Sequence, residues 1–501
     1  MQTHLLLEMA AEALGDREGY ATVEGSLTYA EAFARAKGGA AFVNRFEGDK
    51  LVFLGQNGPA FPLALYAAGL SGRPFVPLNY RLADADLRKL VARTAPALLI
   101  ADSDMLARVE GVEGVQVVSR EAFEAACLDD DNRTVEMPFA DQDIAILLFT
   151  SGTTGEPKAA VLRHGNLTSY VISTVEFMGA SEEETALVSV PPYHIAGIAA
   201  VLTGTYSGRR IAYLHAFAPD AWVQIAHAEK VTHAMVVPTM LMRILESMET
   251  LGLELPHLRA ISYGGGRMPQ AVIEKAMEKL PNVDFVNAYG LTETSSTIAV
   301  LGPDDHRAAF SSDDPKVRAR LGSVGRPLPT LELEVRGPDG KTVLGPGESG
   351  EIYVRGEQVA GEYLHKKVLS DDGWFATNDA GMLDEDGYLF VEGRLDDVIV
   401  RGGENISPGE VEDVLREHPA VADVAVYGLP DDQWGEKVAC SLVLRGDAQP
   451  SVEELARWVQ SRLRSTKTPE TWDFRIELPY NETGKLLRRV LKAELSRSAA
   501  A

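Results

Sequence analysis

The stretch of this sequence whose residue types most clearly suggest chemistry is FTSGTTGEPKAAVLRH, a strand-like run followed by glycines, hydroxyl side chains and a lysine. Glycines let backbone N–H groups approach phosphate oxygens closely, hydroxyl groups add donors, and a lysine adds a movable positive charge. Such a loop suits the triphosphate tail of a nucleotide. The residues expected to bind it are Thr150, Ser151, Gly152, Thr153, Thr154, Gly155 and Lys158.

This loop does not follow the P-loop pattern GxxxxGK[ST]. Gly152 and Gly155 are only three residues apart, and Lys158 comes three residues after the second glycine. A P-loop NTPase is therefore excluded. The other alternative is an ordinary Gly/Ser/Thr turn between two elements, but the whole octapeptide SGTTGEPK is too rare by chance to favour it.

Five further motifs follow along the chain: PPYHIAG from Pro191, YGLTET from Tyr289, GWFATNDAG from Gly373, GRLDDVIVRGGENISPGEVE from Gly393 and NETGKLLRR from Asn481. Together with SGTTGEPK they resemble the ANL superfamily of adenylate-forming enzymes, which includes acyl-CoA synthetases, peptide-synthetase adenylation domains and firefly-type luciferases. The motifs span nearly the whole chain in family order. The resemblance implies that ATP and Mg²⁺ activate a carboxylic acid as an acyl-AMP with release of pyrophosphate, and that coenzyme A then accepts the acyl group with release of AMP.

The first half-reaction brings a carboxylate against a triphosphate, so the site must neutralise charge before an oxygen reaches the α-phosphorus. Glu293 resembles the family's magnesium-binding glutamate, and Mg²⁺ is commonly held by one or two carboxylates plus phosphate oxygens. Thr292 resembles the residue that touches the α-phosphate. Lys485 resembles the C-terminal lysine that bridges the acyl carboxylate and the α-phosphate, and His194 resembles the gate between the acyl pocket and the thiol tunnel.

The nucleoside is expected in a flat slot that the family builds from two strand ends, here residues 263–267 and 287–290. Tyr289 would stack on the adenine. Asp379 resembles the aspartate that accepts both ribose hydroxyls, and Arg394 resembles the arginine that supports the ribose. The nucleotide-binding residues implied by the resemblance are Gly264, Gly265, Gly266, Arg267, Asn287, Ala288, Tyr289, Gly290, Asp379 and Arg394.

Two positions depart from the family pattern. Asn378 stands where the family usually has glycine, between Thr377 and Asp379. Asparagine follows glycine in tolerating a positive φ, so the same turn is expected here. Ala159 stands where a glycine commonly follows the loop lysine.

The second half-reaction requires a different geometry, and the family achieves it by rotating a small C-terminal domain. Asp396 resembles the hinge residue. Gly402 and Gly403 would line the pantetheine tunnel, where side chains would block a thiol. Glu404 and Trp434 are further candidates for contacts with CoA.

The elements that must position these residues follow from periodicity. Short β-type runs beginning at Leu51, Pro96, Ala145, Ala186 and His233 alternate with amphipathic stretches, which indicates βαβ units and parallel sheets. The expected fold class is α/β: an N-terminal domain over 1–395 made of layered α/β subdomains, with a β-rich subdomain over about 323–395. A small, mobile α+β lid domain is expected over 396–501.

Length, charge and cysteine content limit the partners and the cellular location that are expected for this chain. The 501 residues exceed what one core usually organises, and the formal charge of −25 disfavours nucleic acid. Only Cys127 and Cys440 occur, too far apart in the sequence to suggest a disulfide framework or a zinc site, which fits a reducing cytoplasm. The first residues read as a helix rather than a secretory signal, and no apolar run approaches the roughly 20 residues of a membrane span. A homo-oligomer remains open.

Two alternatives also remain open. The first is an acyl-AMP ligase or stand-alone adenylation domain that loads a carrier protein instead of CoA. The second is a non-catalytic nucleotide-binding protein, which the filled set of charged positions disfavours. Glycines 264–266, Ala196 and Gly197 suggest little bulk in part of the acid pocket, and hence a medium-chain, aromatic or alicyclic acid.

Overall fold

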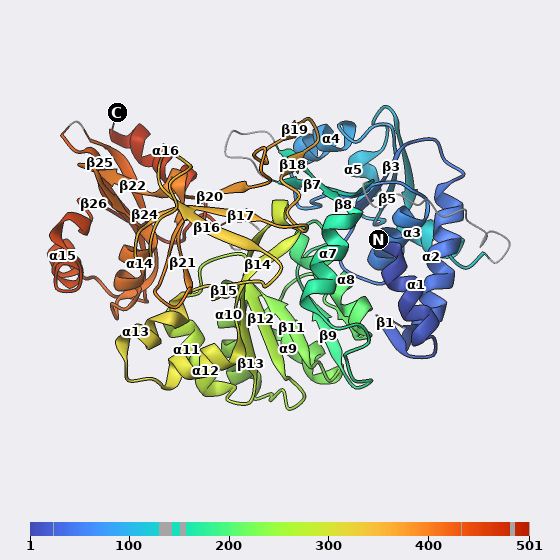
Figure 1. The fold of residues 1–501 in the computed structure, drawn as a ribbon, viewed down its shortest axis with the longest axis horizontal. Helices are drawn as coiled ribbons and strands as arrows, with labels where there is room; N and C mark the ends of the chain where they lie inside the picture. Colours follow the sequence, from blue (N-terminus) through green and yellow to red (C-terminus); the bar gives the residue numbers. More distant parts are fainter. Residues whose placement is uncertain (24, 130–142, 151–156, 432, 481–485, 500–501) are drawn as a thin grey trace.

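The computed structural model describes the chain apart from residues 24, 130–142, 151–156, 432, 481–485 and 500–501 (Figure 1). Four sheets organise the described residues. Two large sheets are built mainly from residues before 330, and two smaller sheets are built from later residues. The prediction of an α/β fold with a large N-terminal and a small C-terminal part is confirmed.

The eight-stranded sheet has the order β19-β18-β8-β7-β4-β3-β5-β6. Its central strands are parallel, as the alternation of strand and helix patterns predicts, and β8 turns back antiparallel to β7. The strands are β3 (Lys50–Leu54), β4 (Phe75–Pro77), β5 (Ala97–Ala101), β6 (Val115–Ser119), β7 (Ile144–Thr150), β8 (Lys158–Arg163), β18 (Glu362–Tyr363) and β19 (Lys366–Lys367). The helices of this part are α2 (Tyr29–Val43), α3 (Ala60–Leu70), α4 (Asp84–Ala92), α5 (Leu106–Val109), α6 (Arg120–Ala126) and α7 (His164–Thr174).

The nine-stranded sheet has the order β15-β14-β13-β12-β11-β9-β10-β1-β2, and its strands from β13 to β1 run parallel. The strands are β1 (Glu18–Thr22), β2 (Gly25–Thr28), β9 (Thr185–Val188), β10 (Arg210–Tyr213), β11 (His233–Val236), β12 (Ala260–Gly264), β13 (Asp284–Leu291), β14 (Ser296–Leu301) and β15 (Arg326–Pro327). The helices are α8 (Ile195–Ser207), α9 (Pro219–Ala228), α10 (Pro238–Leu251), α11 (Gln270–Lys279), α12 (Pro303–Ser311), α13 (Pro315–Arg318) and the 3₁₀ turns η2 (Thr292–Thr294) and η3 (Ala319–Gly322).

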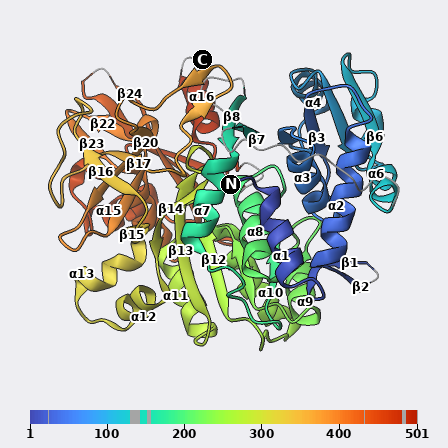
Figure 2. The same ribbon diagram turned by 45° about the vertical axis from the view of Figure 1, so that its right-hand side comes forward.

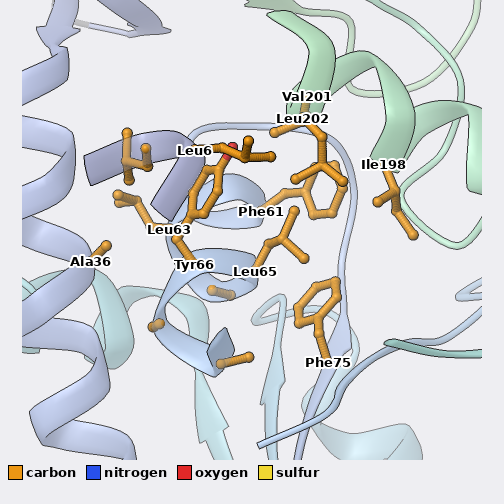
Figure 3. Close-up of a cluster of buried hydrophobic side chains, with 14 of the residues drawn as sticks. Leu6, Ala36, Phe61, Leu63, Leu65, Tyr66, Phe75, Ile198, Val201 and Leu202 are labelled. Carbon is orange, nitrogen blue, oxygen red and sulfur yellow. The ribbon is translucent and has the colours of Figure 1, made fainter. Parts of the chain in front are cut away.

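A continuous apolar cluster joins these two sheets. The predicted N-terminal helix forms as α1 (His4–Ala13) and packs against α2, α3 and α8. Figure 3 shows Leu6 of α1, Phe61 of α3, Phe75 of β4 and Val201 of α8 within this cluster, each 0% exposed. Burial of such large apolar side chains is the main favourable term in folding, so this cluster holds the two sheets in a fixed relation.

The third sheet is antiparallel and has the order β16-β17-β20-β21. Its strands are β16 (Glu332–Arg336), β17 (Gly350–Arg355), β20 (Phe375–Leu383) and β21 (Leu389–Arg394). The expected β-rich subdomain over about 323–395 needs one correction, because two of its segments join the large sheets instead. Strand β15 pairs with β14, and the hairpin β18–β19 pairs with β8. The alternating pattern of the sequence indicates strands but not the sheet that each strand enters.

The residues after Asp397 form a separate sheet with its own buried clusters (Figures 1 and 2). Its strands are β22 (Ile399–Arg401), β23 (Glu404–Ile406), β24 (Val421–Asp431), β25 (Gly435–Leu444) and β26 (Thr471–Arg475). Its helices are α14 (Pro408–Arg416), α15 (Val452–Gln460) and α16 (Arg488–Ala499), and the 3₁₀ turns are η4 (Leu395–Asp397), which leads into the sheet, and η5 (Ser465–Lys467). In the part of the chain that the structure describes, no helix combines the length and the apolar composition that a membrane crossing requires.

Candidate active site

The two residues that flank the predicted phosphate loop in the described part of the chain lie on paired strands. Thr150 at the end of β7 pairs with Lys158 at the start of β8, and the Thr150 hydroxyl donates to the Lys158 carbonyl oxygen at 3.4 Å. Lys158 is exposed, and its Nζ lies 5.8 Å from the ring centroid of Tyr363. The other predicted loop residues, Ser151, Gly152, Thr153, Thr154 and Gly155, lie outside the described residues, as does Lys485.

The predicted metal-binding carboxylate lies directly after strand β13. Glu293 occupies the 3₁₀ turn η2 and is 9% exposed, next to the predicted α-phosphate contact Thr292. The phenol of Tyr363 donates a hydrogen bond of 2.7 Å to Glu293 Oε1. Burial raises the pKa of Tyr363 and the negative charge of Glu293 raises it further, so the phenol stays protonated and donates.

A single carboxylate, that of Glu293, beside a bound triphosphate fits the ligands that magnesium prefers. Among the described residues, no group of three or more His, Cys, Asp or Glu side chains is arranged to hold a metal ion. Mg²⁺ usually keeps one or two carboxylates together with phosphate oxygens and water rather than an all-protein cage. Glu293, with one oxygen engaged by Tyr363, is the carboxylate that would hold the ion beside a bound triphosphate.

The predicted ribose-binding residues Asp379 and Arg394 lie on one sheet and meet Tyr289, the predicted adenine-stacking residue, from another sheet. Asp379 of β20 is buried, and its Oδ2 accepts a hydrogen bond of 2.6 Å from the Tyr289 phenol of β13. Arg394 of β21 donates to Asp379 Oδ1 at 3.1 Å. Burial raises the pKa of Tyr289, and the neighbouring Asp379 carboxylate adds to the increase, so Tyr289 stays a donor. A carboxylate accepts hydrogen bonds at about four lone-pair sites, which is the chemistry that binding of hydroxyl donors requires.

The turn before Asp379 has the expected left-handed conformation. Asn378 adopts φ +60°, which confirms that asparagine retains the turn in place of glycine. The Asn378 side chain also donates to Asp396 Oδ2 at 3.3 Å, a contact that a glycine would lack. Asn378, which replaces the usual glycine, therefore links the turn before the predicted ribose-binding residue Asp379 to the predicted hinge residue Asp396.

The predicted adenine slot contains glycines that allow close approach of neighbouring strands. A β-carbon at Gly264 would overlap the Ala288 carbonyl oxygen, and one at Gly290 would overlap the Ser296 carbonyl oxygen. Gly265 has φ +76°. Asn287 is buried, and its side-chain amide donates to the Ser323 carbonyl oxygen at 2.9 Å. Gly264, Gly290 and Asn287 thus have structural roles in addition to the binding role predicted for them.

The predicted gate, His194, precedes helix α8 as its N-cap residue. Its ring centroid lies 4.5 Å from that of Tyr193, and its Nε2 is buried without a hydrogen-bond partner among the residues that the structure describes. Burial, with a smaller contribution from the Arg81 charge, lowers the pKa of His194 to about 4. The imidazole is therefore neutral near pH 7, and its unpartnered nitrogen is available to a ligand.

The predicted CoA-binding residues gather on the small sheet. Gly402 and Gly403, at φ +56° and +85°, form the turn between β22 and β23. The Gly402 N–H donates to the Trp434 carbonyl oxygen at 2.8 Å, and a β-carbon at Gly402 would lie 2.9 Å from Trp434 Cε3. Among the described residues other than its two chain neighbours, no atom lies within 4 Å of a β-carbon at Gly403. Glu404 Oε1 lies 3.8 Å from Arg464 Nη1.

The side chain of Arg267, which the sequence places at the nucleotide, points to the C-terminal unit instead. Its guanidinium pairs with Asp413 Oδ2 of α14 at 2.5 Å. A β-carbon at Gly409 would overlap Arg267 Nη1, so the absent side chain at Gly409 makes room for this contact. Burial raises the pKa of Asp413, while the Arg267 charge acts in the opposite direction. Only the Arg267 backbone remains near the predicted adenine slot.

The ion pair between Arg267 and Asp413 is expected to have only a small effect on the orientation of the C-terminal unit. The two side chains are 40% and 33% exposed, and pairs of this kind contribute about 0–1 kcal/mol. Arg267→Ala should therefore change the ratio of domain orientations by no more than about fivefold. Distance distributions between spin labels on the two units would measure this ratio. Arg318→Ala, which removes the Arg318–Glu274 pair within the N-terminal part, is the matched control. A redistribution of tenfold or more would contradict the estimate.

The sequence interpretation missed Tyr363. Its local sequence, GEYLHKK, contains no pattern that assigns a role to the aromatic residue. The only available signal was its place in a strand-like segment between YGLTET and GWFATNDAG.

Comparisons with known proteins agree with these motifs. The AMP-binding enzyme family model matches residues 7–364, and the AMP-binding enzyme C-terminal domain model matches residues 410–485. A feruloyl-CoA synthase from Amycolatopsis sp is 34% identical over 472 residues, covering 92% of this chain and 93% of that protein. A 2-succinylbenzoate–CoA ligase from Bacillus licheniformis is 32% identical over 97% of this chain and 98% of its own length. The structure of o-succinylbenzoate CoA synthetase from Bacillus subtilis with its acyl-adenylate intermediate matches with a TM-score of 0.85 and 31% identity, covering 98% of each chain.

Proposed function

The chain belongs to the AMP-binding enzyme family, within the ANL superfamily of adenylate-forming enzymes, and we propose that its acid substrate is aromatic. The chain is an AMP-forming acid–thiol ligase. ATP and a carboxylic acid form an acyl-AMP with release of pyrophosphate, and CoA then accepts the acyl group with release of AMP. ATP, Mg²⁺ and CoA are its cofactor and co-substrates.

One observation carries the assignment of the site. The two ends of the segment 289–293 make hydrogen bonds to two different residues of the site. Tyr289 donates to the Asp379 carboxylate, and Glu293 accepts from the Tyr363 phenol. A single short segment thus spans the proposed ribose and triphosphate ends of ATP. When bound, the metal ion would neutralise part of the charge of the phosphate groups.

We assign the remaining roles to the residues around this segment. Asp379 accepts the ribose hydroxyls, and the Arg394 guanidinium pairs with the Asp379 carboxylate and orients it. Lys158 pairs with the phosphate tail. Lys485 bridges the acid and the α-phosphate, and neutral His194 lies between acid and thiol.

The two half-reactions use two orientations of the C-terminal unit. We place the boundary between residues 1–395 and 396–501 at Asp396, in the 3₁₀ turn η4 that follows β21. The turn at Gly402 and Gly403 would approach the site in the thiol-transfer orientation. Open space at Gly403 and the 45% exposed Trp434 support this role.

An aromatic acid is supported by the similar proteins and by the site. The feruloyl and 2-succinylbenzoate groups in the names of the relatives both contain a benzene ring. A β-carbon at Gly265 would lie 3.6 Å from Val237 Cγ1, and one at Gly266 would lie 3.9 Å from Pro238 Cδ. Gly265 and Gly266 therefore add no side-chain bulk beside the Val237–Pro238 step.

We also propose a cytoplasmic location. Cys127 and Cys440 are buried free thiols, and burial raises the pKa of Cys127 to about 12. Unreactive thiols of this kind fit a reducing compartment.

The proposal is tested with a panel of acids assayed for AMP and pyrophosphate formation in the presence of CoA. We expect cinnamate- and benzoate-type acids to exceed straight-chain acids of similar volume by about tenfold or more in kcat/KM. This corresponds to about 1.4 kcal/mol of differential transition-state binding. Preference for straight-chain acids would overturn the aromatic assignment alone. Stoichiometric ADP in place of AMP would overturn the reaction itself.

A further inference from the structure

The segment 360–364 holds Glu293 by its backbone and by its side chain. The N–H groups of Ala360 and Gly361 donate to the Glu293 carbonyl oxygen at 2.9 and 3.1 Å. Three residues further along the chain, the Tyr363 phenol donates to the Glu293 carboxylate at 2.7 Å. Both the position of Glu293 and the direction of its carboxylate therefore depend on this segment.

The same segment is bound to the strand that carries the phosphate lysine. Tyr363 pairs with Ala160 of β8, and the Leu364 N–H donates to the Ala159 carbonyl oxygen at 3.0 Å. Beside this pairing, Arg163 of β8 donates to both carboxylate oxygens of Glu362, at 3.0 and 2.9 Å. Bidentate pairs of this kind are directional, so the hairpin β18–β19 has a defined register on β8.

The ring of Tyr363 lies between the two charged groups of the phosphate end. Its hydroxyl contacts Glu293, and its face lies 5.8 Å from Lys158 Nζ, within the range of a cation–π contact. Lys158 begins a strand, and Glu293 lies in a single 3₁₀ turn. Without the ring, each of these two side chains would keep rotamer freedom that ATP binding would have to remove.

We propose that Tyr363 is a positioning residue of the ATP site, which holds the Glu293 carboxylate for the metal ion and the Lys158 ammonium group for the triphosphate. This inference rests on the proposed function. Because the Tyr363 phenol donates to Oε1, the Glu293 carboxylate is fixed in one orientation, in which it would hold the metal ion. The segment thus couples the carboxylate of the turn η2 and the lysine of strand β8 into one preorganised pair.

Tyr363→Phe removes the hydroxyl and keeps the ring. Loss of a hydrogen bond to a charged group weakens the binding that depends on it by about 10–100-fold. We expect the Mg²⁺ concentration for half-maximal pyrophosphate release to rise by about this factor. Conversion of supplied acyl-AMP to the thioester should change less than about twofold, since that half-reaction involves no triphosphate.

A binding readout separates positioning from chemistry. The increase in melting temperature that ATP causes is measured on the full chain, with MgCl₂ and with EDTA. In the wild type, MgCl₂ should enlarge this increase, and in Tyr363→Phe most of the enlargement should be lost. Tyr363→Leu, which also removes the ring from Lys158, should weaken ATP binding in EDTA by a further 2–5-fold or so.

Tyr388→Phe is the matched control. Tyr388 donates to Asp305 Oδ1 at 2.6 Å, which is the same chemistry away from the proposed site. It should leave the Mg²⁺ dependence unchanged. An unchanged Mg²⁺ dependence in Tyr363→Phe would overturn the positioning role, as would an equal loss in both half-reactions with a lowered melting temperature of the free protein. A wild type that forms no acyl-AMP would overturn the proposed function instead.

Discussion

Replacing Lys485 with alanine is expected to slow acyl-AMP formation by about 10²–10³-fold, the effect of removing one preorganised donor from a transition state. Conversion of supplied acyl-AMP to the thioester should be much less affected, because Lys485 moves away with the C-terminal unit. The structure describes the residues on either side of 481–485. Tyr480 pairs with Leu486, and Arg488 donates to Glu412 of α14 and to the Val426 carbonyl oxygen of β24.

Measuring pyrophosphate release and thioester formation separately tests this role. Lys492→Ala removes the same charge further along α16 and serves as the control. It should leave both half-reactions within about twofold of the wild type. Equal losses in the two half-reactions of Lys485→Ala would contradict the assigned role, because a lysine used in one orientation only cannot slow both steps alike.

Asp396→Pro is expected to reduce thioester formation from supplied acyl-AMP by orders of magnitude, while acyl-AMP formation persists. A hinge works by changing φ and ψ at a few residues, and proline fixes φ near −65° and restricts the preceding residue. Asp396 is exposed in η4, and 3₁₀ turns have φ of about −50 to −70°. By family resemblance, proline retains the adenylating orientation. Thermal stability should remain nearly unchanged.

The contact between Asn378 and Asp396 requires its own control, because proline also removes the Asp396 carboxylate. Asp396→Ala removes the same contact but leaves φ free. Both half-reactions of Asp396→Ala should remain close to wild type. If both half-reactions also survive in Asp396→Pro, the pivot lies at another residue and the boundary at Asp396 is misplaced.

The fold class was predictable because it depends on local periodicity. Strands such as β3, β5 and β11 are short apolar runs between amphipathic helices, and the chain can satisfy that pattern only by layering helices on parallel sheets. The left-handed turn at Asn378 was predictable for the same reason, since φ preference belongs to the residue itself. The destination of β15 and β18–β19 was not predictable, because a two-residue strand has too little pattern to select a sheet.

The amino-acid sequence therefore defines the chemistry of individual segments: the Gly/Ser/Thr loop with Lys158, the YGLTET turn with Glu293 and the glycines of the strand ends. The tertiary structure alone decided which side chains act on one another. Tyr363 reaches Glu293 across 70 residues of sequence, and Arg267 reaches Asp413 across 146. Both contacts depend on strand register and domain packing, which arise from the summed burial of the whole chain rather than from any local preference.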